Sequence, residues 1–284
     1  MQQGASGIEQ GRLALRAGGL HNPRAMAVIR RQPSRRRNVS GQRRRAGLSV
    51  FVTGASGGIG RTIARACAAA GWFVGVHFSG RESEARKTLR AVRATGGDGM
   101  LCQADIRDST AVRETMGRFA RRAPTPLALI CNAGIASSQL VVRQRAEDWA
   151  AVIETNLTGT FHCLQAMGPL LAAQGGGSIV VIGSYAGFQG STGQAAYAAS
   201  KAGLTGLVKS AAKEWGPENI RINLVLPGWQ QTGLSAEAIA DRRDWSDHAL
   251  GRPPAMEEIA RTIVHLIQLR DVSGQVWNCD SRDF

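Results

Sequence analysis

Short runs of β-branched residues alternate with longer amphipathic stretches from residue 48 onward, and this alternation constrains the fold more than any other feature of the chain. It is typical of parallel strands that are joined by crossover helices. The run at 178–182, Ser-Ile-Val-Val-Ile, is apolar on both faces, as expected for a strand that helices cover on both sides. The sequence therefore predicts an α/β fold with a single doubly wound parallel sheet of about seven strands and helices on both faces.

The predicted elements follow one another without an internal repeat. The segments that fit the strand pattern are 49–53, 73–78, 99–103, 127–131, 178–182, 221–226 and 275–278. The segments that fit the helical pattern are 59–70, 82–95, 109–123, 147–171, 195–215 and 256–269. Because no second domain is visible, we expect residues 48–284 to fold as one unit.

The first 47 residues hold most of the positive charge of the chain. They carry eleven arginines against Glu9 alone, a net charge of +10 out of a total of +14. Residues 48–284 hold the remaining 24 basic and 20 acidic residues and are nearly balanced. Residues 1–47 have no hydrophobic period and few large apolar residues, so we expect a disordered extension. Its role stays open between a passive tail, an organelle transit peptide, contact with nucleic acid or an anionic membrane, and translation that starts downstream at a residue such as Met26.

The cysteines and the hydropathy narrow the class of protein. Mean hydropathy is −0.14, and the chain lacks an uncharged apolar run of the length that spans a bilayer, which excludes a polytopic membrane protein. The cysteines show no C-x-x-C pair and no histidine at ligand spacing, so we expect neither a metal site nor a disulfide framework, and a reducing, cytoplasmic location. They are Cys67, Cys102, Cys131, Cys163 and Cys279.

A glycine-rich segment, Thr-Gly-Ala-Ser-Gly-Gly-Ile-Gly at 53–60, follows the first predicted strand and leads into a helix. Glycine at such a turn lets the backbone approach a pyrophosphate closely, and the helix N-terminus offers unpaired N–H groups to it. The position of the turn favours a dinucleotide-binding site over a purely structural turn. The candidate contacts are Gly54, Ser56, Gly58, Ile59 and Gly60.

A second group of residues is typical of a catalytic site. Tyr197 and Lys201 are four residues apart on a predicted helix and therefore share one face, where an ammonium group can lower the pKa of a phenol. The chain has only two tyrosines, so a chance Tyr-x-x-x-Lys is rare. Ser184 follows the fifth predicted strand, where its hydroxyl can reach a carbonyl oxygen at the carboxyl edge of the sheet.

These motifs, in this order, resemble those of the classical short-chain dehydrogenases/reductases, and the resemblance covers about residues 48–280. Residues 53–60 are similar to the family's T-G-x-x-x-G-x-G, and residues 132–134 to its N-A-G. The resemblance implies a Rossmann-type fold and a catalytic tetrad. In that scheme Ser184 and Tyr197 hydrogen-bond the substrate oxygen, and Tyr197 is the general acid in reduction. Lys201 lowers the phenol pKa and holds the nicotinamide ribose, and Asn156 helps to hold a water relay.

The resemblance also implies further contacts with the cofactor. The second predicted strand ends His-Phe-Ser-Gly-Arg at 77–81, with Phe78 where a carboxylate would pair with the ribose hydroxyl of NAD. Because no acid is present there, NADP(H) is favoured over NAD(H). The implied contacts are Ser79, Arg81, Asp105, Asn132, Ala133, Gly134, Tyr197, Lys201, Pro227, Gly228 and Thr232.

Within the family, the motif order and length most resemble 3-oxoacyl-acyl-carrier-protein reductases. This implies hydride transfer between NADP(H) and a ketone, free or linked to a carrier protein, by a homo-oligomer that is a dimer or a tetramer. A dehydrogenase of sugars, steroids or small alcohols is one alternative, and a non-catalytic dinucleotide sensor whose basic tail binds nucleic acid or membrane is another.

The segment from Trp229 to Pro254 has the character of a substrate lid, and His248 within it matches no known role. Relatives commonly end Gly-Gly after the acid that corresponds to Asp280. This chain continues Ser281-Arg282-Asp283-Phe284 instead, which puts the family's usual tetramer contacts in question.

Overall fold

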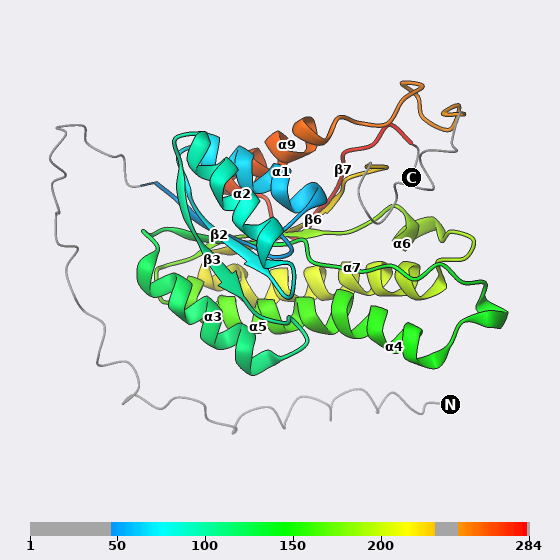
Figure 1. The fold of residues 1–284 in the computed structure, drawn as a ribbon, viewed down its shortest axis with the longest axis horizontal. Coiled ribbons are helices and arrows are strands. Elements are labelled where there is room, and N and C mark those ends of the chain that lie inside the picture. The colour runs from blue at the N-terminus through cyan, green and yellow to red at the C-terminus, as the bar shows by residue number, and fades with distance from the viewer. Residues whose placement is uncertain (1–46, 231–243, 283–284) are drawn as a thin grey trace, which may run out of the picture. The chain divides into compact units, whose positions relative to one another are not determined.

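A seven-stranded sheet forms the centre of the protein in the computed structural model, which describes residues 47–230 and 244–282 (Figure 1). The strand order is β3-β2-β1-β4-β5-β6-β7, and every neighbouring pair is parallel. Most strands carry apolar side chains on both faces, so the sheet is stable only when helices cover both sides. The predicted fold class is confirmed.

The predicted strands agree with the structure to within one residue at each end. The strands are β1 Ser49–Val52, β2 Phe73–Phe78, β3 Asp98–Gln103, β4 Leu127–Cys131, β5 Gly177–Ile182, β6 Ile220–Leu226 and β7 Val276–Asn278. The α-helices are α1 Gly58–Ala69, α2 Glu82–Ala94, α3 Ser109–Arg122, α4 Ala146–Ile153, α5 Gly159–Ala172, α6 Ala186–Gln189, α7 Ala195–Trp215 and α9 Met256–Gln268.

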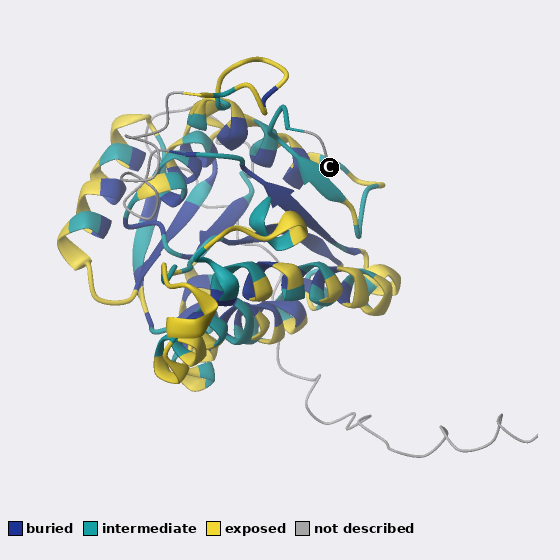
Figure 2. Cartoon of the chain, turned by 90° about the vertical axis from the view of Figure 1, so that its right-hand side faces the viewer, coloured by how far each residue is buried: buried dark blue, intermediate teal, exposed yellow. Residues whose placement is uncertain are grey.

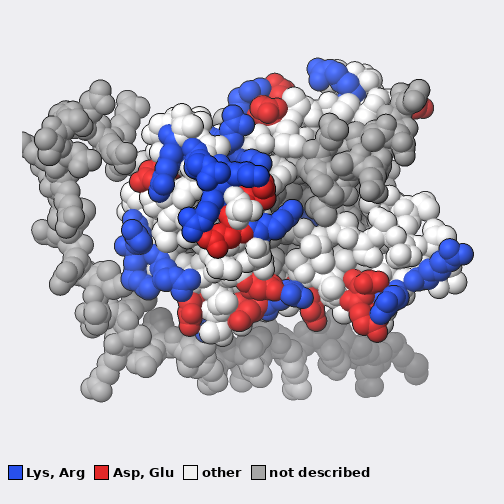
Figure 3. Space-filling model, in the orientation of Figure 1, with Lys and Arg blue, Asp and Glu red and all other residues white. Residues whose placement is uncertain are grey.

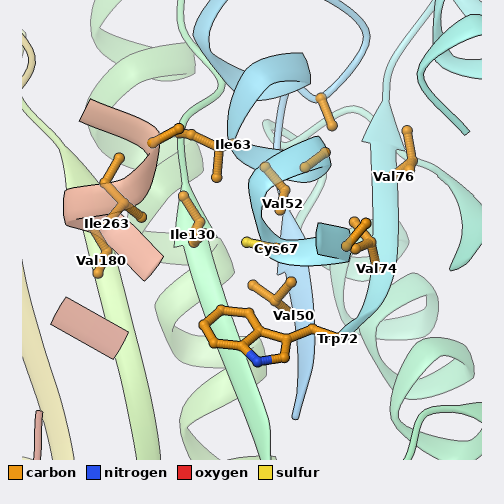
Figure 4. Close-up of a cluster of buried hydrophobic side chains, with 14 of the residues drawn as sticks. Val50, Val52, Ile63, Cys67, Trp72, Val74, Val76, Ile130, Val180 and Ile263 are labelled. Carbon is orange, nitrogen blue, oxygen red and sulfur yellow. The ribbon is translucent and has the colours of Figure 1, made fainter. Parts of the chain in front are cut away.

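Two hydrophobic cores lie on opposite faces of the sheet. Helices α1, α2 and α9 cover one face, and α3, α5 and α7 cover the other (Figure 1). On the first face Val50 and Val74 of the strands pack with Cys67 of α1 and with Trp72 (Figure 4). The five inner strands are almost wholly buried between the helical layers, whereas the edge strands β3 and β7 are partly exposed (Figure 2). Apolar burial of this extent is the main favourable contribution to the free energy of folding.

The order of the strands reverses at β1, since β2 and β3 lie on one side of it and β4 to β7 on the other. In sheets of this kind a crevice opens outside the carboxyl ends of the strands at the reversal, between β1 and β4, and ligands bind there. The glycine-rich turn follows β1, and the Asn-Ala-Gly segment at 132–134 follows β4. The topology therefore brings the two motifs together.

One predicted helix is divided in the structure. The sequence predicts a continuous helix over 147–171, whereas α4 ends at Ile153 and α5 begins at Gly159, with a π-helical turn at Glu154–Thr158 between them. A π-helical turn has one more residue per hydrogen-bonded loop than an α-helical turn and is frequent at functional sites. Asn156 lies within this turn, and its side chain is buried. The π-helical turn therefore contains a residue that the sequence predicts to belong to the site.

No α-helix among residues 47–230 and 244–282 is both long and apolar enough to cross a bilayer. The predicted extension at residues 1–47 lies outside the described part apart from its last residue, and so does Thr232.

Candidate active site

A cleft of about 690 Å³ opens at the carboxyl edge of the sheet. Its walls are the glycine-rich turn after β1 and the segments that follow β2, β3, β4, β5 and β6. The cleft is thus at the place that the strand order favours for a ligand. Of the predicted site residues, those that line it are Gly54, Ser56, Gly58, Ile59, Ser79, Arg81, Asp105, Asn132, Ala133, Gly134, Ser184, Tyr197, Lys201, Pro227 and Gly228.

The glycines of the turn allow close approaches of the backbone. Gly54 has a φ of +63°, and a Cβ there would lie 2.8 Å from the Cα of Ala133. A Cβ on Gly60 would lie 2.4 Å from the carbonyl oxygen of Gly54, so this residue shapes the turn without lining the cleft. At Gly57 a Cβ would meet no atom of the described residues within 4 Å apart from its chain neighbours. The turn is therefore packed against the protein on one side and open on the other.

The N-terminus of α1 suits an anion. Helix α1 begins at Gly58 and has no acid in its first turn, and its N-cap residue, Gly57, supplies no capping side chain. Unpaired N–H groups and the helix dipole at such a terminus attract phosphate. Because Gly57 and Gly58 both line the cleft, the residues present fit the pyrophosphate of a dinucleotide.

The Asn-Ala-Gly segment braces the glycine-rich turn. The hydroxyl of Thr53 accepts hydrogen bonds from the backbone N–H groups of Asn132 (2.8 Å) and Ala133 (2.9 Å). The Asn132 side chain donates in return to the carbonyl oxygens of Thr53 (3.0 Å) and Gly54 (3.2 Å). Hydrogen bonds in both directions hold β1 and β4 at a fixed distance where the cleft begins.

Ser184, Tyr197 and Lys201 meet at the centre of the cleft. The side chains of Ser184, after β5, and Tyr197, on α7, share a hydrogen bond. The Lys201 ammonium lies one turn further along α7, 5.7 Å from the centroid of the Tyr197 ring, and donates to the carbonyl oxygen of Ile182 at 2.8 Å. The structure thus brings together two hydroxyl groups and one cation on adjacent elements.

Burial shifts the pKa values of Tyr197 and Lys201. It raises the pKa of the Tyr197 phenol, and the hydrogen bond with Ser184 offsets only part of the rise. It also lowers the pKa of Lys201 to about 8. For Tyr197, loss of contact with water outweighs the hydrogen bond with Ser184, and Lys201 is not among the groups that shift its pKa. That Lys201 lowers the phenol pKa therefore stays a prediction.

Asn156 connects two walls of the cleft. Its side-chain oxygen accepts from the N–H of Ile135 (2.8 Å), and its amide donates to the carbonyl oxygen of Ile135 (2.9 Å) and to the Ser200 hydroxyl (3.0 Å). The Ser200 hydroxyl donates in turn to the carbonyl oxygen of Tyr197 at 2.7 Å. Asn156 therefore fixes the loop after β4 against the turn of α7 that carries Tyr197.

The end of β2 differs from the sequence-based expectation. Phe78 is only 3% exposed and belongs to the core under α1 and α2, so its side chain does not reach the cleft. The cleft is lined by His77, Ser79 and Arg81 instead. Burial lowers the pKa of His77 to about 4, and its Nδ1 accepts a hydrogen bond from the N–H of Gly54 at 3.1 Å. The neutral imidazole thus supports the glycine-rich turn.

Asp105 lies after β3, where the cleft meets the edge of the sheet. Its carboxylate accepts from Nη2 of Arg107 at 2.6 Å and from Nε at 3.0 Å. The hydrogen bonds from Arg107 hold the pKa of Asp105 below its ordinary value. Both side chains are about half exposed and line the cleft, so the pair can open toward a ligand at little cost.

The comparisons with known proteins agree with this geometry. The family model described as short chain dehydrogenase matches residues 49–243. The chain belongs to this family. A 3-oxoacyl-[acyl-carrier-protein] reductase FabG of Staphylococcus epidermidis is 34% identical over 80% of this chain and 95% of its own length. A 3-oxoacyl-[acyl-carrier-protein] reductase of Synechocystis is 37% identical over 81% of this chain and 94% of its own length.

A solved structure supports the assignment. The crystal structure of a Sinorhizobium meliloti protein considered a short-chain alcohol dehydrogenase matches with a TM-score of 0.78 and 30% identity. The match covers 83% of this chain and 95% of that one. As a short chain dehydrogenase, the protein is an oxidoreductase that acts on a CH–OH or C=O group with a nicotinamide dinucleotide cofactor.

The motifs of the short chain dehydrogenases did not reveal every residue of the site. Ser200 holds one wall of the cleft, although a single hydroxyl group gives no signal in a sequence. Thr53 begins the glycine-rich motif, but the motif does not show that its hydroxyl binds the backbone of residues 132 and 133. Arg282 lines the cleft from the segment after β7. The departure from Gly-Gly after Asp280 is the one sequence signal that points to Arg282.

Proposed function

We propose that the protein is an NADP(H)-dependent reductase of 3-oxoacyl thioesters, carried by an acyl-carrier protein or by coenzyme A. The observation that supports this most is the hydrogen-bonded pair of Ser184 and Tyr197, which lies in the same cleft as the open helix N-terminus of α1. Two hydroxyl groups that can both donate to one oxygen favour a substrate carbonyl there. The relatives named above supply the substrate class.

Each residue of the proposed tetrad has a separate task. Ser184 and Tyr197 orient the ketone oxygen, and Tyr197 donates the proton as that oxygen gains charge. Lys201 places a cation beside the phenol and can bind ribose hydroxyls. Asn156 positions Tyr197 through Ser200. The bound cofactor supplies the hydride.

We propose NADP(H) over NAD(H) because of the residues that follow β2. Ser79 and Arg81 line the cleft and are exposed, and no acid from this segment lines the cleft to repel a 2′-phosphate. Basic side chains also gather on α2 beside them (Figure 3). The exposed basic residues of α2 are Arg86, Lys87, Arg90 and Arg93. Three of them are paired with acids, Arg86 with Glu82, Lys87 with Glu84 and Arg93 with Asp98, so Arg81, which lines the cleft, is the basic residue of this segment best placed for a 2′-phosphate.

The test of the proposed function is a matched panel of ketones. Oxidation of NADPH and of NADH is followed with acetoacetyl thioesters, ketose sugars and cyclic ketones. We expect the highest kcat/KM with NADPH and a thioester. A sugar or a cyclic ketone that is reduced more efficiently would contradict the substrate class, and a preference for NADH would contradict the cofactor.

The pKa of Lys201 predicts a pH dependence. Because this pKa is about 8, the ammonium group loses its charge as the pH rises through 8, and the ribose hydroxyls lose a charged donor. We expect kcat/KM for the cofactor to fall above pH 8. Lys201→Arg keeps its charge throughout and should give a lower but flat profile between pH 7 and 9.5. If kcat/KM of the Lys201→Arg variant also falls above pH 8, a group other than Lys201 causes the fall.

We also propose a homo-oligomer, either a dimer or a tetramer. Several large apolar side chains of the segment before α4, of α4 and of α5 are exposed, and such a cluster favours association. They include Val141 (76%), Val142 (88%), Trp149 (41%) and Phe161 (44%). Light scattering should give two or four times the chain mass of 30.2 kDa. A mass of one chain at micromolar concentration would contradict the proposal.

A reducing compartment such as the cytosol fits the cysteines. All five are free in the structure, and four of them are buried. Disulfides persist in oxidising compartments, so free thiols favour a reducing one.

A further inference from the structure

Arg282 brings a positive charge to the part of the cleft that faces away from the glycine-rich turn. It comes from the segment after β7 and lines the cleft together with Tyr185 and Trp229. Among the described residues that line the cleft, Asp105 is the one acid, and it follows β3 on the other side of the sheet reversal. The acid that pairs with Arg282 is Asp280, which does not itself line the cleft.

The side chain of Arg282 is held rigidly. Its Nε donates to Oδ2 of Asp280 at 2.7 Å, and its Nη2 donates to the same oxygen. Its own carbonyl oxygen accepts from the Asn278 amide at 3.0 Å. The guanidinium lies 4.0 Å from the centroid of the Tyr185 ring and 5.9 Å from that of Trp229. Stacking and hydrogen bonds together fix its orientation before a ligand arrives.

The partner carboxylate is enclosed by the protein. The Asp280 side chain is 0% exposed, whereas that of Arg282 is 10% exposed. Oδ1 of Asp280 lies 3.1 Å from Nε2 of His248, and Nδ1 of this histidine lies 2.7 Å from the Asp247 carboxylate. His248, to which the sequence assigns no role, thus lies against the carboxylate that holds Arg282, although Nε2 and Oδ1 do not have the geometry of a hydrogen bond.

Gly228 makes room for this arrangement. A Cβ at Gly228 would lie 2.6 Å from Oδ2 of Asp280, and the residue has a φ of +68°. The backbone of the 248–251 segment is also tied to the C-terminal segment, since the N–H of Ala249 donates to the carbonyl oxygen of Ser281 at 3.0 Å. Three separate segments of the chain therefore support Arg282.

One edge of the guanidinium is left for a ligand. Nε and one N–H of Nη2 face Asp280, and Nη1 donates to none of the described residues. The two N–H groups at the end of the guanidinium, one from each Nη, form the fork that binds a carboxylate through two parallel hydrogen bonds. A ligand without a charge would leave these donors unpaired as water is displaced.

We propose that Arg282 forms a subsite for a carboxylate at the far end of the substrate's acyl chain, which rests on the proposed function as a 3-oxoacyl thioester reductase. The preferred substrates are then 3-oxoacyl thioesters of dicarboxylic acids. Arg282 acts on specificity and takes no part in the proton or hydride transfer. Asp280 and His248 are positioning residues for it.

The test uses two thioesters of six carbons that differ at C6 alone, which is a carboxylate in one and a methyl group in the other. The wild-type protein should reduce the carboxylate form with at least 10-fold higher kcat/KM. Arg282→Gln should lower kcat/KM for the carboxylate form by about 10- to 100-fold and change that for the methyl form by less than about 3-fold. Arg282→Lys should restore part of the preference.

Removal of Arg282 alone leaves Asp280 buried without its partner, which can destabilise the fold. The double variant Arg282→Gln/Asp280→Asn removes both charges and should show the same loss of preference. Equal losses for both thioesters, or a wild-type protein without preference, would overturn the proposal.

A binding measurement separates this proposal from the proposed function. Glutarate is titrated into the protein with NADP⁺ present and its binding followed by calorimetry. Binding to the wild-type protein and at least 10-fold weaker binding to Arg282→Gln would support the subsite even if neither thioester is reduced. Equal affinity for both proteins would overturn the subsite even if both thioesters are reduced.

Discussion

Tyr197→Phe should lower kcat by about 10³-fold and leave the affinity for NADPH within about 3-fold of the wild-type value. The substitution keeps the ring, whose centroid lies 5.7 Å from the Lys201 ammonium, and removes only the hydroxyl that shares a hydrogen bond with Ser184. Without that hydroxyl the ketone oxygen gains charge with no positioned proton donor. Steady-state oxidation of NADPH gives kcat, and a fluorescence titration of NADPH gives the affinity.

Ser184→Ala and the double variant provide the control for this result. If both hydroxyl groups serve one oxygen, their effects are not additive, and the double variant should lose little more than Tyr197→Phe alone. A Tyr197→Phe protein that retains more than a tenth of kcat would show that the proton comes from another group. Simple additivity would show that the two hydroxyl groups act at different places.

The fold and the cofactor end could be predicted because local rules determine them. The alternation of strands and helices sets the parallel sheet, and the order of strands places residues 53–60 beside residues 132–134. A glycine with a positive φ, such as Gly54, is a local requirement that a sequence shows directly. The strand order and the contact between these two segments agree with the prediction, whereas the contacts with the cofactor stay predictions.

Side-chain direction was harder to predict. His77 and Phe78 are adjacent on β2, and successive side chains of a strand point to opposite faces. The structure turns His77 toward the cleft and Phe78 into the core. The division between α4 and α5 was not predicted, because the apolar pattern of 147–171 does not show the extra residue of a π-helical turn.

Contacts between distant segments were beyond the sequence. Arg282, His248 and Tyr185 belong to three segments that no local pattern connects, yet Asp280 and the ring of Tyr185 hold one guanidinium between them. The pKa of Tyr197 is a similar case. The spacing of Tyr197 and Lys201 on one helix predicts the distance between their side chains. The burial that raises the pKa of Tyr197 depends instead on every element around the cleft.

Gly60→Ala should destabilise the protein by about 2–3 kcal/mol and weaken NADPH binding by at least 10-fold. The new Cβ would lie 2.4 Å from the Gly54 carbonyl oxygen and 2.5 Å from the Asn132 side-chain nitrogen. The first is a backbone atom that cannot move without shifting the turn, and the second atom donates a hydrogen bond to it. Urea denaturation gives the free energy of unfolding, and a titration gives the affinity.

Gly206→Ala is the matched control, because Gly206 is also a helical glycine, on α7, but beyond the helix's own backbone a Cβ there would meet none of the described residues within 4 Å. Alanine has the higher helix propensity, so this variant should be more stable than the wild-type protein by about 0.5–1 kcal/mol. The same gain acts at Gly60 and is outweighed there by the clash. If the two variants changed stability and cofactor affinity alike, the close approach of α1 to the turn would not be what requires glycine at position 60, and the cradle for the pyrophosphate would have to be sought in other atoms.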